Sequence, residues 1–191
     1  DLMARSALLF TDGDRANMDI LITMLGEVGR ALETAPGCFL GAQNFYPARQ
    51  GAFTGEIAPE QLLALGCTYA LAGHSERRHV LGETDEFVGR KMAAGLSAGL
   101  TMILCVGETI EERREGRVSE VLSRQLRTGL ETARCAASAD RLCVAYEPVW
   151  AIGTGEVAGP GEIVEAHAVV RETLMSLLPE TGTEVRILYG G

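Results

Sequence analysis

Short apolar runs alternate along this chain with longer amphipathic stretches. The runs are four to six residues long and apolar at nearly every position; they cover 19–23, 38–43, 69–72, 102–106, 142–146 and 185–189. Half-exposed antiparallel strands alternate between apolar and polar residues, whereas strands buried on both faces do not. The pattern therefore predicts six buried strands of a parallel sheet.

Between the runs, apolar residues recur at helical spacing over 59–65, 84–99, 110–137 and 160–178. Pro59 stands at a first helical position, Thr84 is a candidate N-cap, and Gly66 and Gly99 are stop signals. We expect the long third stretch to break at Gly116. Strands alternating with helices indicate an α/β fold with right-handed crossovers, and both an open doubly wound sheet and a barrel fit.

Composition narrows the class of protein. The chain has 191 residues, 47% of them hydrophobic, and a formal charge of 17 − 26 = −9. The apolar fraction excludes a disordered chain, and the arginine clusters are interleaved with glutamate, unlike the basic stripe of a nucleic-acid binder. No apolar run approaches the roughly 18–20 residues of a membrane span. We expect a single domain over 1–191 with no nucleic-acid or membrane partner.

The five cysteines, at 38, 67, 105, 135 and 143, are odd in number and include no Cys-x-x-Cys pair. Most lie within or beside apolar runs, as reduced core thiols do. This pattern favours a cytoplasmic protein and disfavours a disulfide framework or a zinc site. We expect neither a metal nor a cofactor.

Polar residues and a glycine lie at or just after the carboxyl ends of four predicted strands. These residues are His74, Glu108, Glu147 and Gly190. The carboxyl ends of parallel strands share one face, which carries the active site in barrels and open sheets alike. Residues far apart in the sequence are therefore expected to converge.

Two of them are candidates for acid–base chemistry. Glu147 follows an apolar strand and precedes Pro148; desolvation there would make its carboxylate a better base, although a strand-end carboxylate paired with an arginine fits as well. His74 precedes Ser75-Glu-Arg-Arg, the opening of a short helix, whose N-terminus disfavours a charged imidazole. A structural histidine is the alternative, and we expect His79 and His167 to be structural or exposed.

The segment 148–155, Pro-Val-Trp-Ala-Ile-Gly-Thr-Gly, is an apolar body between a rigid proline and glycines. A mobile lid needs this build, because hinges must absorb changes in the backbone dihedrals. The Gly-Thr-Gly and Tyr189-Gly-Gly clusters could present backbone N–H groups to an anion. Each cluster alone is weak support, since most glycine pairs are turns. On one shared face they predict a phosphate cradle.

Six segments then resemble the triosephosphate isomerase family in order and spacing: Gly-Ala-Gln-Asn (41–44), Ala-Phe-Thr-Gly-Glu (52–56), Gly-His-Ser-Glu-Arg-Arg (73–78), Cys-Val-Gly-Glu (105–108), Ala-Tyr-Glu-Pro-Val-Trp-Ala-Ile-Gly-Thr-Gly (145–155) and Ile-Leu-Tyr-Gly-Gly (187–191). The resemblance covers about residues 38–191. It implies a (β/α)₈ TIM barrel that interconverts dihydroxyacetone phosphate and D-glyceraldehyde 3-phosphate, in glycolysis and gluconeogenesis.

Residue by residue, the resemblance implies that Glu147 moves a proton between C1 and C2 through an enediolate, while neutral His74 polarises the carbonyl oxygen. This family is itself a standard example of acid–base tuning, so these roles come from the resemblance and not from the spacing of the residues. Glu76 matches an acidic residue beside the site and is expected to be catalytic as well, and Asn44 and Cys105 match buried supporting positions.

The lid implied by the resemblance runs from Pro148 to Ala158 and includes Val149, Trp150, Ala151, Ile152, Gly153, Thr154 and Gly155. Tyr189 would hold it closed. Substrate binding would involve Asn44, Gly153, Gly190 and Gly191, with Gly153 giving a backbone donor to the phosphate. The loop 50–56 resembles an interdigitating loop whose Thr54 reaches into a partner's active site, so the resemblance implies a homodimer.

The chain also departs from the family. The family's first strand with Asn-x-Lys is not found, and the sequence stops before the last strand. The run 19–23 passes into a helical pattern at Thr23–Met24 without the two to six residues that such a connection needs. We expect an incomplete barrel with residues omitted at both ends and between 23 and 24. An inactive truncated barrel or partner-binding remnant is the alternative function, and a phosphoribosyl isomerase barrel is a third, less favoured.

Overall fold

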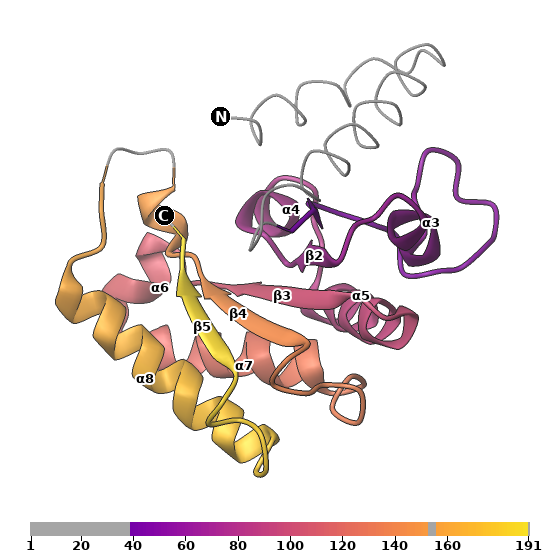
Figure 1. The fold of residues 1–191 in the computed structure, drawn as a ribbon. Coiled ribbons are helices and arrows are strands. Elements are labelled where there is room, and N and C mark those ends of the chain that lie inside the picture. Colours follow the sequence, from indigo (N-terminus) through magenta and orange to yellow (C-terminus); the bar gives the residue numbers. More distant parts are fainter. Residues whose placement is uncertain (1–38, 153–155, 191) are drawn as a thin grey trace.

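The computed structural model describes residues 39–152 and 156–190. Within them a five-stranded parallel sheet has the order β1-β2-β3-β4-β5, and Figure 1 shows it as a curved layer. The strands are β1 (Gly41–Ala42), β2 (Tyr69–Ala72), β3 (Thr101–Val106), β4 (Leu142–Tyr146) and β5 (Arg186–Tyr189). Each strand pairs with the next strand of the chain. A doubly wound sheet reverses its order at a switch point, so this order favours the barrel-type arrangement of the two that the sequence left open.

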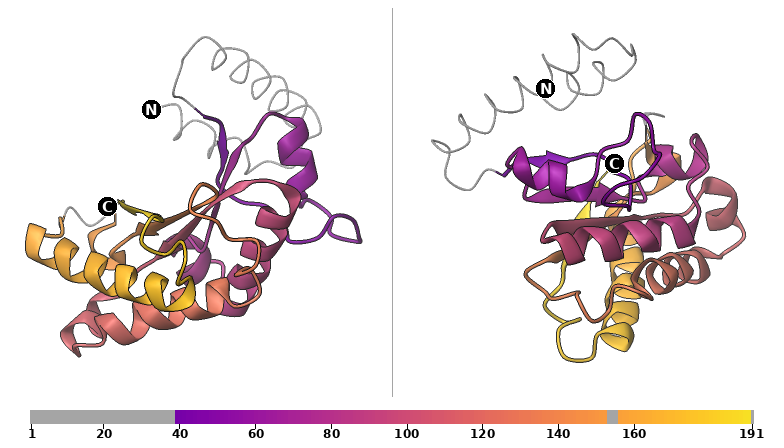
Figure 2. Two further views of the ribbon diagram at one scale, coloured as in Figure 1. Left: turned by 60° about the horizontal axis from the view of Figure 1, so that its bottom comes forward. Right: turned by 90° about the vertical axis from the view of Figure 1, so that its right-hand side faces the viewer.

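The helices are α3 (Pro59–Ala64), α4 (Ser75–His79), α5 (Asp85–Ala98), α6 (Ile110–Arg114), α7 (Val118–Leu130) and α8 (Pro160–Leu177), with a 3₁₀ turn η1 (Val149–Ala151). Helix α5 packs on α7, and α7 packs on α8. These three long helices lie on one side of the sheet, in the order of their strands (Figure 2). None of the described helices is both long and apolar enough to cross a membrane.

The local signals explain where the helices begin and end. The Thr84 side chain accepts a hydrogen bond from the Phe87 N–H at 3.2 Å, which caps α5. Gly99 ends that helix with a φ of +116°, and Gly116, with a φ of +72°, separates α6 from α7. A residue with a Cβ rarely adopts such dihedrals. The predicted breaks at Gly99 and Gly116 are therefore confirmed.

Two element boundaries differ from the sequence prediction. The run 38–43 forms a strand only over Gly41–Ala42, and the helix expected to extend to residue 137 ends at Leu130. Beyond it the chain continues in turns, with the N–H groups of Ala136 and Ala137 bonded to the carbonyl of Ala133. The predicted strand 19–23 and the Thr23–Met24 junction lie outside the described residues.

The core lies between the sheet and the three long helices. Its centre is built from fully buried side chains on β3, β4 and the facing helices, among them Leu104, Val144, Leu122 and Leu174. Removing this much apolar surface from water is the main driving force for folding. The core fixes the strands as a rigid platform, and the loops at their carboxyl ends carry the polar residues.

Candidate active site

The carboxyl ends of β2 and β4 bring His74 and Glu147 together. His74 Nε2 lies 3.9 Å from Glu147 Oε2. The backbone N–H of Glu147 donates to the Val106 carbonyl at 2.8 Å, so the hydrogen-bonded pairing of β3 and β4 extends to this residue. The convergence predicted from the sequence is therefore present for these two side chains.

His74 is held by the start of α4. It is the N-cap of that helix, and its Nδ1 accepts a hydrogen bond from the Glu76 backbone N–H at 3.3 Å. A nitrogen that accepts a hydrogen bond carries no proton, so this contact places the proton of a neutral imidazole on Nε2. The N–H of that nitrogen then faces Glu147. Glu76 itself is exposed, in the first turn of α4.

Glu147 is largely buried, beside Cys105 and Gly190. Its side chain is 12% exposed, and Oε2 is buried without a hydrogen-bond partner among the described residues. Gly190, at the end of β5, lies so close that a Cβ on it would sit 3.7 Å from the Glu147 Cγ. A buried carboxylate oxygen with no partner is costly in a folded protein. Such an atom is available to accept a proton from a bound molecule.

Cys105 lies beside this carboxylate on β3. Burial raises the pKa of its thiol well above the usual value, and the negative charge of Glu147 raises it further. A thiol in this setting stays protonated and inert. Cys105 is therefore a neutral, buried side chain beside Glu147.

A second carboxylate, Glu108, anchors the segment that follows Glu147. Its side chain is fully buried, and Oε1 accepts hydrogen bonds from Tyr146 Oη, Arg113 Nη1 and Trp150 Nε1 at 3.0, 2.9 and 3.0 Å. Its backbone carbonyl also accepts from the Val149 N–H at 3.1 Å. Among the described residues the strand-end carboxylate paired with an arginine is thus Glu108 and not Glu147.

The Tyr146 phenol, in the same hydrogen-bond network, stays protonated. Burial, and then the negative charge of Glu108, raise the pKa of this phenol strongly, so Tyr146 remains a neutral donor. The sequence pattern predicted Glu108 at a strand end but assigned it no partners. Its position directly after Gly107 at the end of an apolar run was the available signal, whereas no spacing rule pointed to Arg113 or Tyr146.

The predicted lid is only partly described. Pro148 precedes the η1 turn, in which the Ala151 N–H donates to the Pro148 carbonyl at 2.9 Å. Ile152 follows it with extended backbone. The hydroxyl of Tyr189, on β5, is buried and has no hydrogen-bond partner among residues 39–152 and 156–190. Gly153, Thr154, Gly155 and Gly191 lie outside the described residues.

Asn44 and Thr54 have surroundings of their own in the described structure. The Asn44 Oδ1 accepts a hydrogen bond from the buried Lys91, which also contacts Glu83 Oε1, both at 2.5 Å. Sequence reasoning missed Lys91, because it stands among the apolar residues of α5. Thr54 is exposed in a loop.

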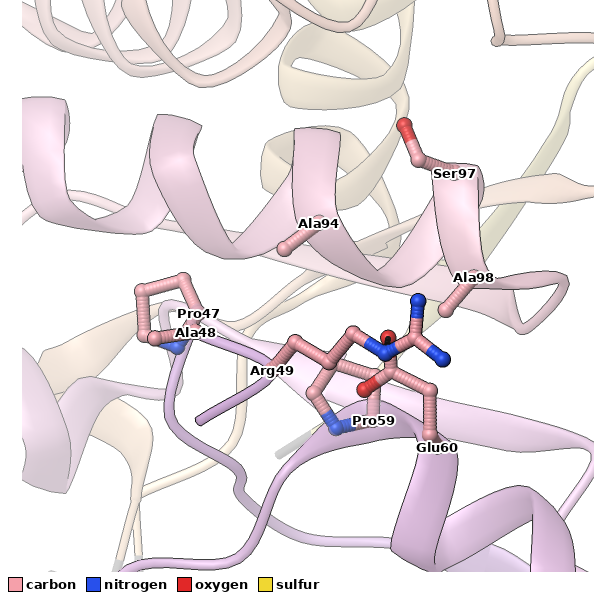
Figure 3. Close-up of a pocket in the computed structure, with 8 residues that line it drawn as sticks. All are labelled: Pro47, Ala48, Arg49, Pro59, Glu60, Ala94, Ser97 and Ala98. Carbon is pink, nitrogen blue, oxygen red and sulfur yellow. Dashed lines mark ion pairs between the residues drawn. The ribbon is translucent and has the colours of Figure 1, made fainter. Parts of the chain in front are cut away.

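A hollow of about 240 Å³ lies between the loop residues 47–49, the start of α3 and the end of α5. Figure 3 shows Arg49 reaching across it toward Glu60, where Nε and Oε1 are 3.8 Å apart. The hollow shares no residue with the His74–Glu147 pair. We therefore place the candidate active site at the strand ends and not in this hollow.

Comparison with known proteins agrees with the geometry. A family model described as triosephosphate isomerase matches residues 15–191. A triosephosphate isomerase from Nitratidesulfovibrio vulgaris (Miyazaki F) is 58% identical over 169 residues, covering 88% of this chain and 67% of the relative. One from Oleidesulfovibrio alaskensis is 52% identical, covering 87% and 67%.

The solved structure of triosephosphate isomerase from Bartonella henselae is similar to this fold with a TM-score of 0.77. The two share 37% identity, and the match covers 89% of this chain and 68% of that one. The chain thus spans about two thirds of the length of these proteins.

Proposed function

The chain belongs to the triosephosphate isomerase family, and from that premise we propose that Glu147 and His74 are the catalytic residues of an aldose–ketose isomerisation. The substrates would be dihydroxyacetone phosphate and D-glyceraldehyde 3-phosphate. The observation that supports these roles is the buried, unpartnered Glu147 Oε2 at 3.9 Å from His74 Nε2.

The geometry supports a different role for each of the two side chains. Glu147 Oε2 would take a proton from one carbon of the substrate and return it to the neighbouring carbon. The Nε2–H of neutral His74 would donate to the substrate oxygen as negative charge develops there. Because Glu147 Oε2 is buried and has no hydrogen-bond partner among residues 39–152 and 156–190, the carboxylate has one oxygen available to take a proton.

The segment after Glu147 would act as the lid. Its anchoring through Trp150 and Glu108 supports a stiff body, and the role of a lid is to exclude water from the charged intermediate. Backbone N–H groups of Gly153 and Gly191 would bind the phosphate, and Tyr189 would hold the closed lid. The N–H of Gly190 donates to the Tyr146 carbonyl at 3.0 Å, so Gly190 would contact the substrate as a residue without a side chain beside Glu147. Glu76 and Asn44 would support the site through their neighbours, His74 and Lys91.

We also propose a homodimer in which Thr54 contacts the partner's active site. The exposed loop around Thr54 and the half-exposed Phe53, whose ring lies 4.2 Å from that of Tyr46, support a surface that a second copy covers. Sedimentation velocity of the protein with Thr54→Arg should show a shift toward monomer.

The free thiols at 67, 105, 135 and 143 support a reducing, cytoplasmic location.

A coupled assay with glyceraldehyde 3-phosphate tests the proposed function. The protein should be active, and Glu147→Gln should lower kcat about 100- to 10,000-fold, because a general base alone is worth on the order of 10²–10⁴. Glu165→Gln, at a carboxylate whose side chain is 59% exposed, is the control. Retained activity in Glu147→Gln would remove that residue from the base role.

A further inference from the structure

A glutamine on α7 reaches the strand end next to the candidate base. Gln125 is 4% exposed. Its Oε1 accepts a hydrogen bond from the Gly107 N–H at 2.9 Å, and its Nε2 donates to the Gly107 carbonyl at 3.1 Å. Both bonds are buried. One side-chain amide thus satisfies both polar groups of the first residue after β3, as a neighbouring strand would.

Gly107 in turn lies directly against the backbone of Glu147. A Cβ on Gly107 would stand only 1.8 Å from the Glu147 carbonyl oxygen and 2.7 Å from its carbon. Two hydrogen bonds flank this contact: the Glu147 N–H donates to the Val106 carbonyl, and the Val149 N–H donates to the Glu108 carbonyl. Any displacement of Gly107 would therefore move the peptide that carries Glu147.

We propose that Gln125 is a positioning residue for the reaction. By holding Gly107 at two points, it fixes the backbone of Glu147 and of the first lid residues against β3. The inference rests on the proposed role of Glu147 as the base. Gln125 lies on the helix side of the sheet and acts only through Gly107, so it contacts no reacting atom.

The chemistry of the side chain explains why glutamine suits this position. The site needs one donor and one acceptor, held in a fixed plane, to match the N–H and C=O of one residue. A buried backbone group left without a partner is strongly disfavoured, so the strand end would rearrange to find one. A misplacement of about 1 Å at a reacting group can cost about 100-fold in rate.

Gln125→Met removes both hydrogen bonds while keeping the length of the side chain. We expect kcat to fall about 10- to 100-fold with KM within about twofold, because substrate binding does not involve Gln125. Thr173→Val is the matched control. It removes a buried hydroxyl on α8 that lies 3.1 Å from Ser123 Oγ of α7, far from Gly107 in the sequence, and it should leave kcat unchanged.

Gln125→Glu distinguishes positioning from general stability. A protonated carboxyl keeps both contacts, since its carbonyl oxygen accepts from the Gly107 N–H and its hydroxyl donates to the Gly107 carbonyl. An ionised carboxyl loses the donor. We measure kcat of each variant relative to wild type from pH 5 to 9, well below each Tm. At pH 5 this relative kcat should be at least about fivefold higher for Gln125→Glu than for Gln125→Met.

The proposal is overturned if Gln125→Met keeps kcat within twofold of wild type, or if Gln125→Glu at pH 5 is no better than Gln125→Met. If Gln125→Met does not fold, Gln125→Glu is judged against the wild type alone: the ratio of its kcat to that of the wild type should be at least about fivefold higher at pH 5 than at pH 9, and an equal ratio overturns the proposal. A wild-type protein without isomerase activity, or an active Glu147→Gln, would refute the proposed function instead. Those two assays come first, so the two failures are distinguishable.

Discussion

Glu108 offers a sharp test of how the lid segment is anchored. Its buried Oε1 accepts three hydrogen bonds, from Arg113, Tyr146 and Trp150. Glu108→Gln keeps the shape and one acceptor oxygen but removes the charge. A hydrogen bond to a charged group contributes about 1.5–3 kcal/mol, against about 0.5–1.5 kcal/mol for a neutral one. In this variant the bonds from Tyr146 and Trp150 join neutral groups, whereas the Arg113 donor keeps its charge. Two weakened bonds predict a loss of about 2–3 kcal/mol in the free energy of unfolding.

The chain contains its own control for this experiment. Arg113 also pairs with Glu165, with Nη2 and Oε2 3.0 Å apart, but that carboxylate is 59% exposed whereas Glu108 is fully buried. Exposed ion pairs contribute little because water and salt screen them. Glu165→Gln should therefore change the free energy of unfolding by no more than about 0.5 kcal/mol.

Urea denaturation measures both variants, and fluorescence reports on the lid directly because Trp150 is the sole tryptophan of this sequence. Only Glu108→Gln should shift the native emission of Trp150, since only that change weakens its anchoring bond. Equal losses of stability in the two variants, or a loss below about 0.5 kcal/mol in Glu108→Gln, would refute the reasoning.

Three further predictions concern stability and reactivity. Burial and Arg171 lower the pKa of His167 from 6.5, so its contribution to stability is present above pH 6.5 and lost as pH falls; His167→Gln should flatten the decline in Tm between pH 7 and 5, and an unchanged slope would contradict this. Leu104→Ala, at a fully buried site on β3, should cost about 2–5 kcal/mol of unfolding free energy in urea, and a cost below about 1 kcal/mol would contradict the packing. Thiol labelling followed by peptide mapping should modify exposed Cys135 before the buried cysteines Cys67, Cys105 and Cys143, and earlier labelling of Cys105 would contradict its raised pKa.

The sequence predicted the elements with strong local signals. Four of the strands, at 69–72, 102–106, 142–146 and 185–189, match β2, β3, β4 and β5 to within one residue, because continuous apolar runs have few alternatives in an α/β chain. The same reasoning placed His74 and Glu147 on one face. Strand boundaries were harder to predict where pairing with the neighbouring strand decides them, as at β1, which extends over only two residues.

Long-range side-chain partners could not be predicted in this way. Gln125 and Gly107 are 18 positions apart, and Tyr146 and Glu108 are 38 apart. Their contacts depend on the packing of α7 and β4 against β3, which no local pattern encodes. Lys91 shows the same limit: a lysine among apolar helix positions gave no sign of Asn44 and Glu83, which lie beside it only in the folded chain.

The most direct test of the central claim is deuterium exchange at the substrate carbon, followed by ¹H NMR in D₂O. A base that moves a proton between neighbouring carbons through an enediolate exchanges it with solvent. The wild-type protein should incorporate deuterium into carbon-bound positions of the triose phosphate during turnover, and Glu147→Gln, with an unchanged fold by circular dichroism, should not. Exchange at the wild-type rate in Glu147→Gln would contradict the claim that Glu147 is the base.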